Sequence, residues 1–227
     1  KNLRSRCSAL IKTKNETVLI DTSPDLRQQL LANKITNIDK VFFSHMHADQ
    51  THGINDLRVF YIKKRKTIPV YADKQTSKYL NDNFKYCFVN NNKEYPATLR
   101  LNKIKKTLFV KDGLKKVKIQ AITVDHGNVD SICYIIDKKL AYISDVSNIR
   151  KNDFVYFKGL KYLIIDCLWF KEHPSHLNFI NCLNLINKLK PKKAILTNLH
   201  TDLDYAFLRK KLPKNIEPAY DGLTINL

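Results

Sequence analysis

The sequence has few of the features that mark a secreted or membrane-spanning chain. Its five cysteines are scattered, odd in number and never spaced as C-x-x-C. This argues against a disulfide framework or a cysteine-based zinc site and favours a reducing cytoplasm. Apolar stretches such as residues 162–165 are too short to cross a bilayer, so we expect no membrane association. The basic residues at 1–6 lead into too few apolar residues for a signal peptide.

Positive charge is present in excess. The chain has 40 lysines and arginines against 21 acidic residues, a net charge of +19, which is a common property of nucleic-acid-binding proteins. However, the basic runs at 63–66, 103–106 and 115–118 contain no interleaved aromatic residues and no nucleic-acid-binding motif. We interpret them as solvated surface and expect no specific nucleic-acid partner.

Length and patterning predict one layered α/β domain over residues 1–227. Short β-branched runs alternate with helical patterns. The expected strands are 17–21, 40–44, 68–71, 116–124, 132–136, 140–144, 162–166 and 194–197, and the expected helices are 23–32, 53–62, 74–83, 177–189 and 203–212. The Asn-rich segment 90–102 is expected to be irregular, and Asp221-Gly222 predicts a hairpin turn.

Histidines and aspartates follow several of these strands. Asp21, His45, Asp145 and Asp166 end or directly follow expected strands, and His200 follows shortly after another. Loops at strand ends on a rigid sheet are common places for functional sites.

The segment 44–53 carries the densest group of candidate metal ligands. His45, His47 and Asp49 alternate along a short loop after an apolar strand, and His52 follows. Such spacing lets one loop direct three ligands into a small volume. Imidazole and carboxylate together suit Zn²⁺, Mn²⁺ or Fe²⁺, so the residue types predict a metal site without fixing its metal.

This motif resembles a known family. His45-x-His47-x-Asp49, followed by Gly53, is similar to the H-x-H-x-D-H-x-x-G signature of the metallo-β-lactamase superfamily. His126, Asp145 and His200 follow in the order of the superfamily's remaining ligands. Segments 21–25, 52–58, 144–145, 196–197 and 219–222 resemble the branch that contains phosphoribosyl 1,2-cyclic phosphate phosphodiesterase.

The resemblance implies a four-layer αββα sandwich and two divalent metal ions, Zn²⁺ or Mn²⁺. It also implies a first strand with a Gly/Ser-rich loop, which would precede Lys1. It assigns the first metal to His45, His47 and His126, the second to Asp49 and His200, and the bridging position to Asp145. On this resemblance, the two metals would activate a hydroxide that attacks the phosphodiester. Asp49 is thus both ligand and catalytic residue, and the cysteines have no catalytic task.

One position departs from the signature. Gln50 stands where the family has its last histidine, and a neutral amide is a poorer transition-metal ligand than imidazole. His52 is an alternative ligand, although the resembling branch carries a histidine there as well. We expect a second site that is weak or selective for a harder ion such as Mn²⁺.

Four further residues are candidates with open alternatives. His176 matches the region in which the resembling phosphodiesterases place a histidine that protonates the leaving group, and His173 is a weaker candidate for contact with phosphate. Asp166 is a candidate metal ligand or a carboxylate that orients a histidine. Arg58 is a candidate phosphate contact. The structural alternative for His173 and His176 is a role at the start of the helix. For Asp166 it is the capping of a turn, and for Arg58 it is a surface ion pair.

These features predict a hydrolase that cleaves a small cyclic or nucleotide-like phosphodiester. A tRNA 3′-processing endonuclease of the same superfamily is the first alternative, although the chain has no long inserted arm to hold tRNA. A metal- or nucleotide-binding protein without catalysis is the second. The natural substrate and a homodimeric state are left open by the sequence.

Overall fold

The computed structural model describes residues 1–90 and 95–227, which form two compact units. The N-terminal unit comprises residues 5–105 and 109–117, and the C-terminal unit comprises residues 1–4, 106–108 and 118–227. Each unit has its own sheet and hydrophobic core. The single domain expected from the sequence therefore stays a prediction. No helix among the described residues is both long and apolar enough to span a bilayer.

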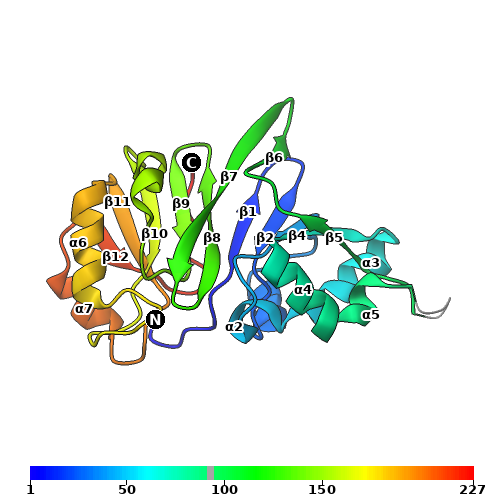
Figure 1. Cartoon of the computed structure of the whole chain (residues 1–227), viewed down its shortest axis with the longest axis horizontal. Coiled ribbons are helices and arrows are strands. Elements are labelled where there is room, and N and C mark those ends of the chain that lie inside the picture. The colour runs from blue at the N-terminus through cyan, green and yellow to red at the C-terminus, as the bar shows by residue number, and fades with distance from the viewer. Residues whose placement is uncertain (91–94) are drawn as a thin grey trace. The chain divides into compact units, whose positions relative to one another are not determined.

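A five-stranded sheet forms the centre of the N-terminal unit (Figure 1). Only the first pair of strands is antiparallel. Buried strands of a mostly parallel sheet are apolar throughout, and Val18, Leu19 and Ile20 are all buried. In spatial order the strands are β1 (Ala9–Lys12), β2 (Thr17–Ile20), β3 (Lys40–Phe42), β4 (Ile68–Ala72) and β5 (Leu99–Lys103).

Short helices follow these strands. They are α1 (Leu26–Ala32), α2 (Ala48–Thr51), the 3₁₀ helix η1 (Ile54–Leu57), α3 (Arg58–Lys64), α4 (Lys74–Asn83) and α5 (Lys85–Phe88). Helix α4 begins where the Asp73 carboxylate accepts a hydrogen bond of 2.7 Å from the Thr76 amide, as in a standard N-cap. Helix α2 is only one turn long and carries Asp49, so the metal-ligand motif spans a strand-to-helix loop.

A seven-stranded mixed sheet forms the centre of the C-terminal unit, although residues 109–112 and 115–117 of two of its strands are assigned to the N-terminal unit. Its spatial order is β12 (Ile216–Pro218), β11 (Lys193–Thr197), β10 (Tyr162–Asp166), β9 (Leu140–Ile143), β8 (Val129–Ile136), β7 (Lys115–His126) and β6 (Thr107–Asp112). Strands β9 to β12 are parallel, whereas β7, β8 and β9 are antiparallel neighbours. The carboxyl ends of β9, β10 and β11 therefore meet at one edge, where open α/β sheets commonly bind ligands.

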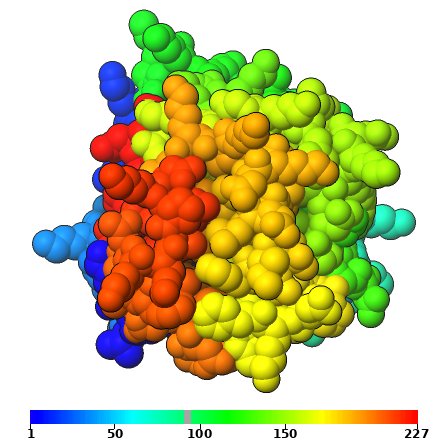
Figure 2. All heavy atoms as spheres, turned by 90° about the vertical axis from the view of Figure 1, so that its left-hand side faces the viewer, coloured from blue at the N-terminus to red at the C-terminus, as the bar shows by residue number. Residues whose placement is uncertain are grey.

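Two α-helices and a 3₁₀ helix, η2 (Lys151–Phe157), pack with this sheet. Figure 2 looks onto the face that carries α6 (Phe179–Leu189) and α7 (Tyr205–Lys211). Helix α6 buries Cys182, Ile186 and Leu189, a spacing of four and three residues that forms one helical face. Its first turn is capped by Asn178, whose side chain accepts a hydrogen bond of 2.8 Å from the Asn181 amide.

The structure confirms the predicted α/β class, with two mixed sheets flanked by helices. Two local predictions were wrong. Asp221 and Gly222 form a turn, but no strand follows it among the described residues, so there is no hairpin. Within the Asn-rich segment, Leu99–Lys103 is strand β5, and residues 91–94 lie outside the described part of the chain.

Candidate metal centre

The His45 loop is anchored by a buried carboxylate. Asp21 follows β2, has no exposed surface and adopts a left-handed φ of 62°. Its Oδ1 accepts a hydrogen bond of 2.7 Å from the amide of Ser44, the residue before His45. Asp21 therefore fixes the backbone at the start of the ligand loop.

His45 and His47 direct their nitrogens at each other. His45 Nε2 lies 2.9 Å from His47 Nδ1, and the other His45 nitrogen lies 3.0 Å from the Ser44 hydroxyl. Two imidazole nitrogens that share a tetrahedral ion at about 2.0–2.1 Å lie about 3.3 Å apart. His45 is buried and His47 is exposed, so the pair lies at the edge of the unit with a separation close to that of two ligands of one ion.

Gln50 contacts the third member of the motif. Its amide nitrogen donates a hydrogen bond of 3.0 Å to Asp49 Oδ2, and its side chain is completely buried. The backbone beside it is tied to the segment after β2, because Thr22 N donates to Gln50 O at 2.7 Å and Gly53 N donates to Thr22 O at 2.9 Å. Gln50 thus occupies the position of the missing histidine and holds the Asp49 carboxylate.

Gly53 permits this close backbone approach. A Cβ at this position would lie 1.9 Å from the Ser23 carbonyl oxygen and 2.9 Å from Leu26 Cβ. No other residue type fits without moving backbone, which explains the glycine of the motif in this chain.

Two other candidate site residues of the N-terminal unit, His52 and Arg58, make contacts outside the His45–His47 pair. His52 Nε2 is 2.9 Å from the Tyr79 hydroxyl, and its ring contacts Tyr79 and Phe84. His52 is therefore engaged with α4, which argues against its replacing the missing ligand. The Arg58 guanidinium lies 5.9 Å from the centre of the Tyr95 ring, and no described contact of Arg58 indicates a phosphate site.

The C-terminal unit brings together a second group of candidate ligands. One ligand atom each from His126, Asp145 and His176 lies within 4.8 Å of the others. His126 ends β7, Asp145 lies two residues beyond β9, and His176 precedes α6. His126 and Asp145 are each 1% exposed, whereas the His176 side chain is 14% exposed. An imidazole and carboxylate set of this kind fits Zn²⁺ or Mn²⁺.

Neighbouring groups orient both histidine rings. His126 Nδ1 lies 2.7 Å from the Ser175 carbonyl oxygen, to which it donates, so its Nε2 is the available ligand atom. His176 Nδ1 lies 2.8 Å from Asp166 Oδ2, and the two rings are 4.7 Å apart. Gly127, at a φ of 63°, allows the approach, because a Cβ there would be 2.7 Å from Ser175 Cβ.

Asp166 is completely buried beside His176. Desolvation by burial raises the pKa of its carboxyl, while hydrogen bonds from His176, Val146 and Asn198 oppose that shift. His173 lies on the exposed side of His176, with ring centres 5.0 Å apart, and desolvation, followed by the charge of His176, lowers the pKa of His173. Asp166 thus contacts Nδ1 of His176, and its role as an orienting carboxylate stays a prediction.

His200 lies outside this group among the described residues. Its ring packs on Trp169 with centres 4.9 Å apart, and its Nδ1 accepts a hydrogen bond of 3.2 Å from the Asp202 amide. The sequence did not single out Asn198, whose amide nitrogen lies 3.3 Å from carboxylate oxygens of both Asp145 and Asp166. Its only sequence signal was its position directly after a strand.

None of the five cysteines forms a disulfide, and four of them are buried. Burial raises the pKa of Cys133, and a hydrogen bond with Cys167 together with burial raises the pKa of Cys182. Few thiolates form at neutral pH under these conditions, so these groups are poor nucleophiles and poor metal ligands.

Several known proteins are similar to this chain in sequence or in fold. Residues 16–198 match the model of the beta-lactamase superfamily domain. The crystal structure of a diphosphatase from the PhnP family is 30% identical to this chain with a TM-score of 0.86, and the match covers 96% of this chain and 82% of the diphosphatase. The Zn²⁺-bound PqqB of Methylobacterium extorquens has a TM-score of 0.79 at 14% identity, covering 98% of this chain and 88% of PqqB.

Two other similarities bear on the alternatives. The short form of human tRNase Z has a TM-score of 0.68 at 14% identity, covering 97% of this chain and 91% of that enzyme. An octanoyltransferase of Porphyromonas gingivalis is 31% identical over 226 residues, or 97% of this chain, but the chain spans only 44% of that protein. The superfamily match and the 30% identical diphosphatase establish the family. The chain belongs to the beta-lactamase superfamily and has the metallo-β-lactamase fold.

Proposed function

We propose that this protein hydrolyses a small phosphodiester, of the cyclic or nucleotide-like kind. The observation that carries the proposal is the group of His126, Asp145 and His176, in which the completely buried Asp166 contacts His176. Similarity to a diphosphatase over most of both chains supports a substrate with a phosphoryl group at its centre.

Six residues are proposed to hold two divalent ions. The family resemblance assigns His45, His47 and His126 to the first ion, Asp49 and His200 to the second, and Asp145 to both. The donor types and the separation of the His45 and His47 nitrogens support this assignment for the first ion. The role of His200 rests on the resemblance alone, because its ring packs on Trp169. Bound ions supply an activated water and positive charge for the phosphoryl oxygens.

His176 is proposed to protonate the leaving oxygen. Because its Nδ1 faces Asp166, its Nε2 is the atom that can deliver a proton. An orienting carboxylate fixes the tautomer of a histidine. His173, on the exposed side of His176, is a candidate contact for the substrate's phosphate. We also propose a cytoplasmic location, for which the scattered and odd-numbered cysteines of the sequence are the support.

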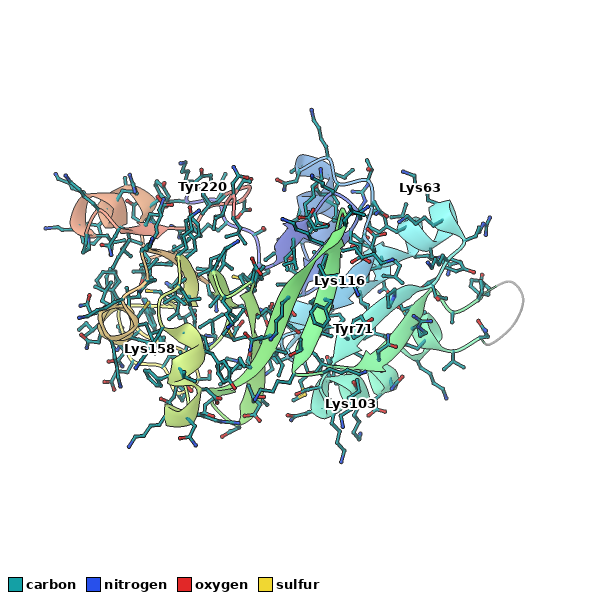
Figure 3. The ribbon with its side chains drawn as sticks, turned by 90° about the horizontal axis from the view of Figure 1, so that it is seen from above. Lys63, Tyr71, Lys103, Lys116, Lys158 and Tyr220 are labelled. Carbon is teal, nitrogen blue, oxygen red and sulfur yellow. The ribbon has the colours of Figure 1, made fainter. Side chains whose placement is uncertain are left out.

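Neither tRNA processing nor acyl transfer has comparable support. The similarity to tRNase Z is one of fold, and the lysines are spread over separate elements. Figure 3 labels Lys63 on α3, Lys103 on β5, Lys116 on β7 and Lys158 after η2, and all four are exposed. The name octanoyltransferase belongs to a protein of which this chain matches less than half, so we do not assign acyl transfer to this chain.

The test is a substrate comparison with the metal-loaded protein. A ribose cyclic phosphate, bis(p-nitrophenyl) phosphate, a dinucleoside diphosphate and a tRNA precursor are compared at about 50 and 200 mM salt. We expect turnover of a small substrate to change modestly with salt, whereas contacts to many phosphates typically lose about 10³–10⁵ in affinity over this range. Structure-specific tRNA cleavage that persists at the higher salt would favour the tRNA-processing alternative. Tight metal binding without any hydrolysis would favour a binding protein.

A further inference from the structure

Three parallel strands place polar side chains at one edge of the C-terminal sheet. Asp166 is the last residue of β10, Asn198 directly follows β11, and Asp145 lies two residues beyond β9. Asp166 pairs with Thr197 in the β10–β11 register, and Ile165 pairs with Ile143 in the β10–β9 register. The topology therefore brings two carboxylates and one amide together.

The Asn198 side chain lies between the two carboxylates. Its Nδ2 is 3.3 Å from Asp145 Oδ1, 3.3 Å from Asp166 Oδ1 and 3.4 Å from His176 Nδ1. An amide nitrogen carries two N–H donors, enough for one hydrogen bond to each carboxylate. The carbonyl end of the amide would face two acceptors, so only the nitrogen end fits here.

Burial makes these contacts important. Asp145 is 1% exposed and Asp166 is 0% exposed, and a buried carboxylate needs hydrogen-bond donors to remain ionised. Two such groups close together also repel each other. A donor shared between them reduces both penalties and fixes the distance between their oxygens.

We propose that Asn198 is a positioning residue that couples Asp145 to the His176–Asp166 pair. Through Asp145 it acts on metal binding, and through Asp166 it acts on the orientation of His176. The inference rests on the proposed function, because that function assigns Asp145 as a ligand and His176 as the proton donor. Asn198 itself touches neither substrate nor metal in this assignment.

A backbone role is the competing explanation. Asn198 has a left-handed φ of 57°, and asparagine adopts this conformation more readily than most residues. Asn198→Gly separates the two explanations, because glycine accepts the same backbone conformation and lacks the amide. Lys190→Gly is the matched control, since Lys190 has a φ of 51° at the end of α6 in the same unit.

The experiment compares these variants in chelator competition and in turnover. We expect Asn198→Gly to reduce metal affinity or turnover by about 10–100-fold, the usual effect of removing a group that orients a ligand. Lys190→Gly should match the wild type in both. The turnover loss should be larger for a poor alcohol leaving group than for p-nitrophenolate, because only the former needs His176.

A double-mutant cycle with His176→Asn completes the test. If Asn198 acts through His176, Asn198→Gly should cause little additional loss of turnover on the poor leaving group once His176 is replaced. Wild-type metal affinity together with full additivity in Asn198→Gly would overturn the inference. Failure of the proposed function would be recognised separately, as absence of hydrolysis by the loaded wild type, while the chelator competition would still test Asn198.

Discussion

Replacing His176 with asparagine tests the proposed proton donor while preserving its contact with Asp166. In the structure His176 Nδ1 lies 2.8 Å from Asp166 Oδ2, and an asparagine amide can donate to the same carboxylate. The amide cannot release a proton to a leaving oxygen. The variant therefore removes the acid and keeps a donor beside the buried carboxylate.

The expected loss in turnover is about 10²–10⁴, the typical contribution of general acid catalysis. At about 1.36 kcal/mol for each factor of ten, this raises the barrier by about 2.7–5.4 kcal/mol. The stability change should be smaller. A buried acceptor left without donors costs about 1–3 kcal/mol, but Val146 N still donates to Asp166 Oδ2 at 3.2 Å. We therefore expect less than about 1 kcal/mol of lost unfolding free energy.

The assay measures turnover on bis(p-nitrophenyl) phosphate and on a diester with an alcohol leaving group, together with metal content. The penalty should be small for p-nitrophenolate, which needs little protonation, and large for the alcohol. His173→Asn is the control, because His173 lies on the exposed side of His176 and should not change the dependence on the leaving group. Equal penalties on both substrates would refute the acid role. Loss of metal would show instead that His176 is a ligand, as its place beside His126 and Asp145 allows.

Three further variants test other parts of the account. Gln50→His should raise affinity for the second ion without harming phosphodiesterase activity when Zn²⁺ or Mn²⁺ is supplied, and a large loss of activity would show that the Gln50–Asp49 contact is needed. Gly53→Ala should lower the free energy of unfolding in urea by about 3 kcal/mol, because its Cβ would lie 1.9 Å from the Ser23 carbonyl oxygen. Gly159→Ala is the control and should cost only about 1 kcal/mol, because no atom lies within 4 Å of its Cβ. Equal costs for the two variants would refute the steric argument. The hydrogen bond from Asn148 and the Arg150 guanidinium lower the pKa of Asp125. Asp125→Asn should therefore lower the free energy of unfolding by about 0.5–1 kcal/mol at pH 7. The difference from the wild type should vanish as the pH falls below about 3.9, the unfolded-state value, and through the lowered pKa of the folded state. An unchanged difference at pH 2 would contradict the assignment.

The elements that the sequence predicted well have strong local patterns. Strand β10 and helix α4 match their expected bounds, because one is a continuous apolar run and the other begins at a capping aspartate. The missed strands lie at the edges of their sheets. Strand β12 contains Pro218, and proline is tolerated at an edge although it argues against a strand in the sequence.

The candidate site was predictable where residue type and spacing carry the chemistry. The histidines and aspartates of the motif and of the strand ends fall into this class. The groups that orient them do not, because their roles depend on contacts made across the fold. Ser175 contributes only a backbone oxygen to His126, and Asn198 reaches two carboxylates from neighbouring strands. No pattern in the sequence distinguishes them from other loop residues.

Metal content measured together with hydrolysis in single-ligand variants tests the central claim most directly. The wild type, His45→Ala and His126→Ala are loaded with Zn²⁺ or Mn²⁺, dialysed mildly and assayed with bis(p-nitrophenyl) phosphate. The account predicts nearer one than two retained ions in the wild type, because Gln50 replaces an imidazole, and loss of that ion and of turnover in both variants. Retention of the ion and of full activity in either variant would contradict the proposed metal centre.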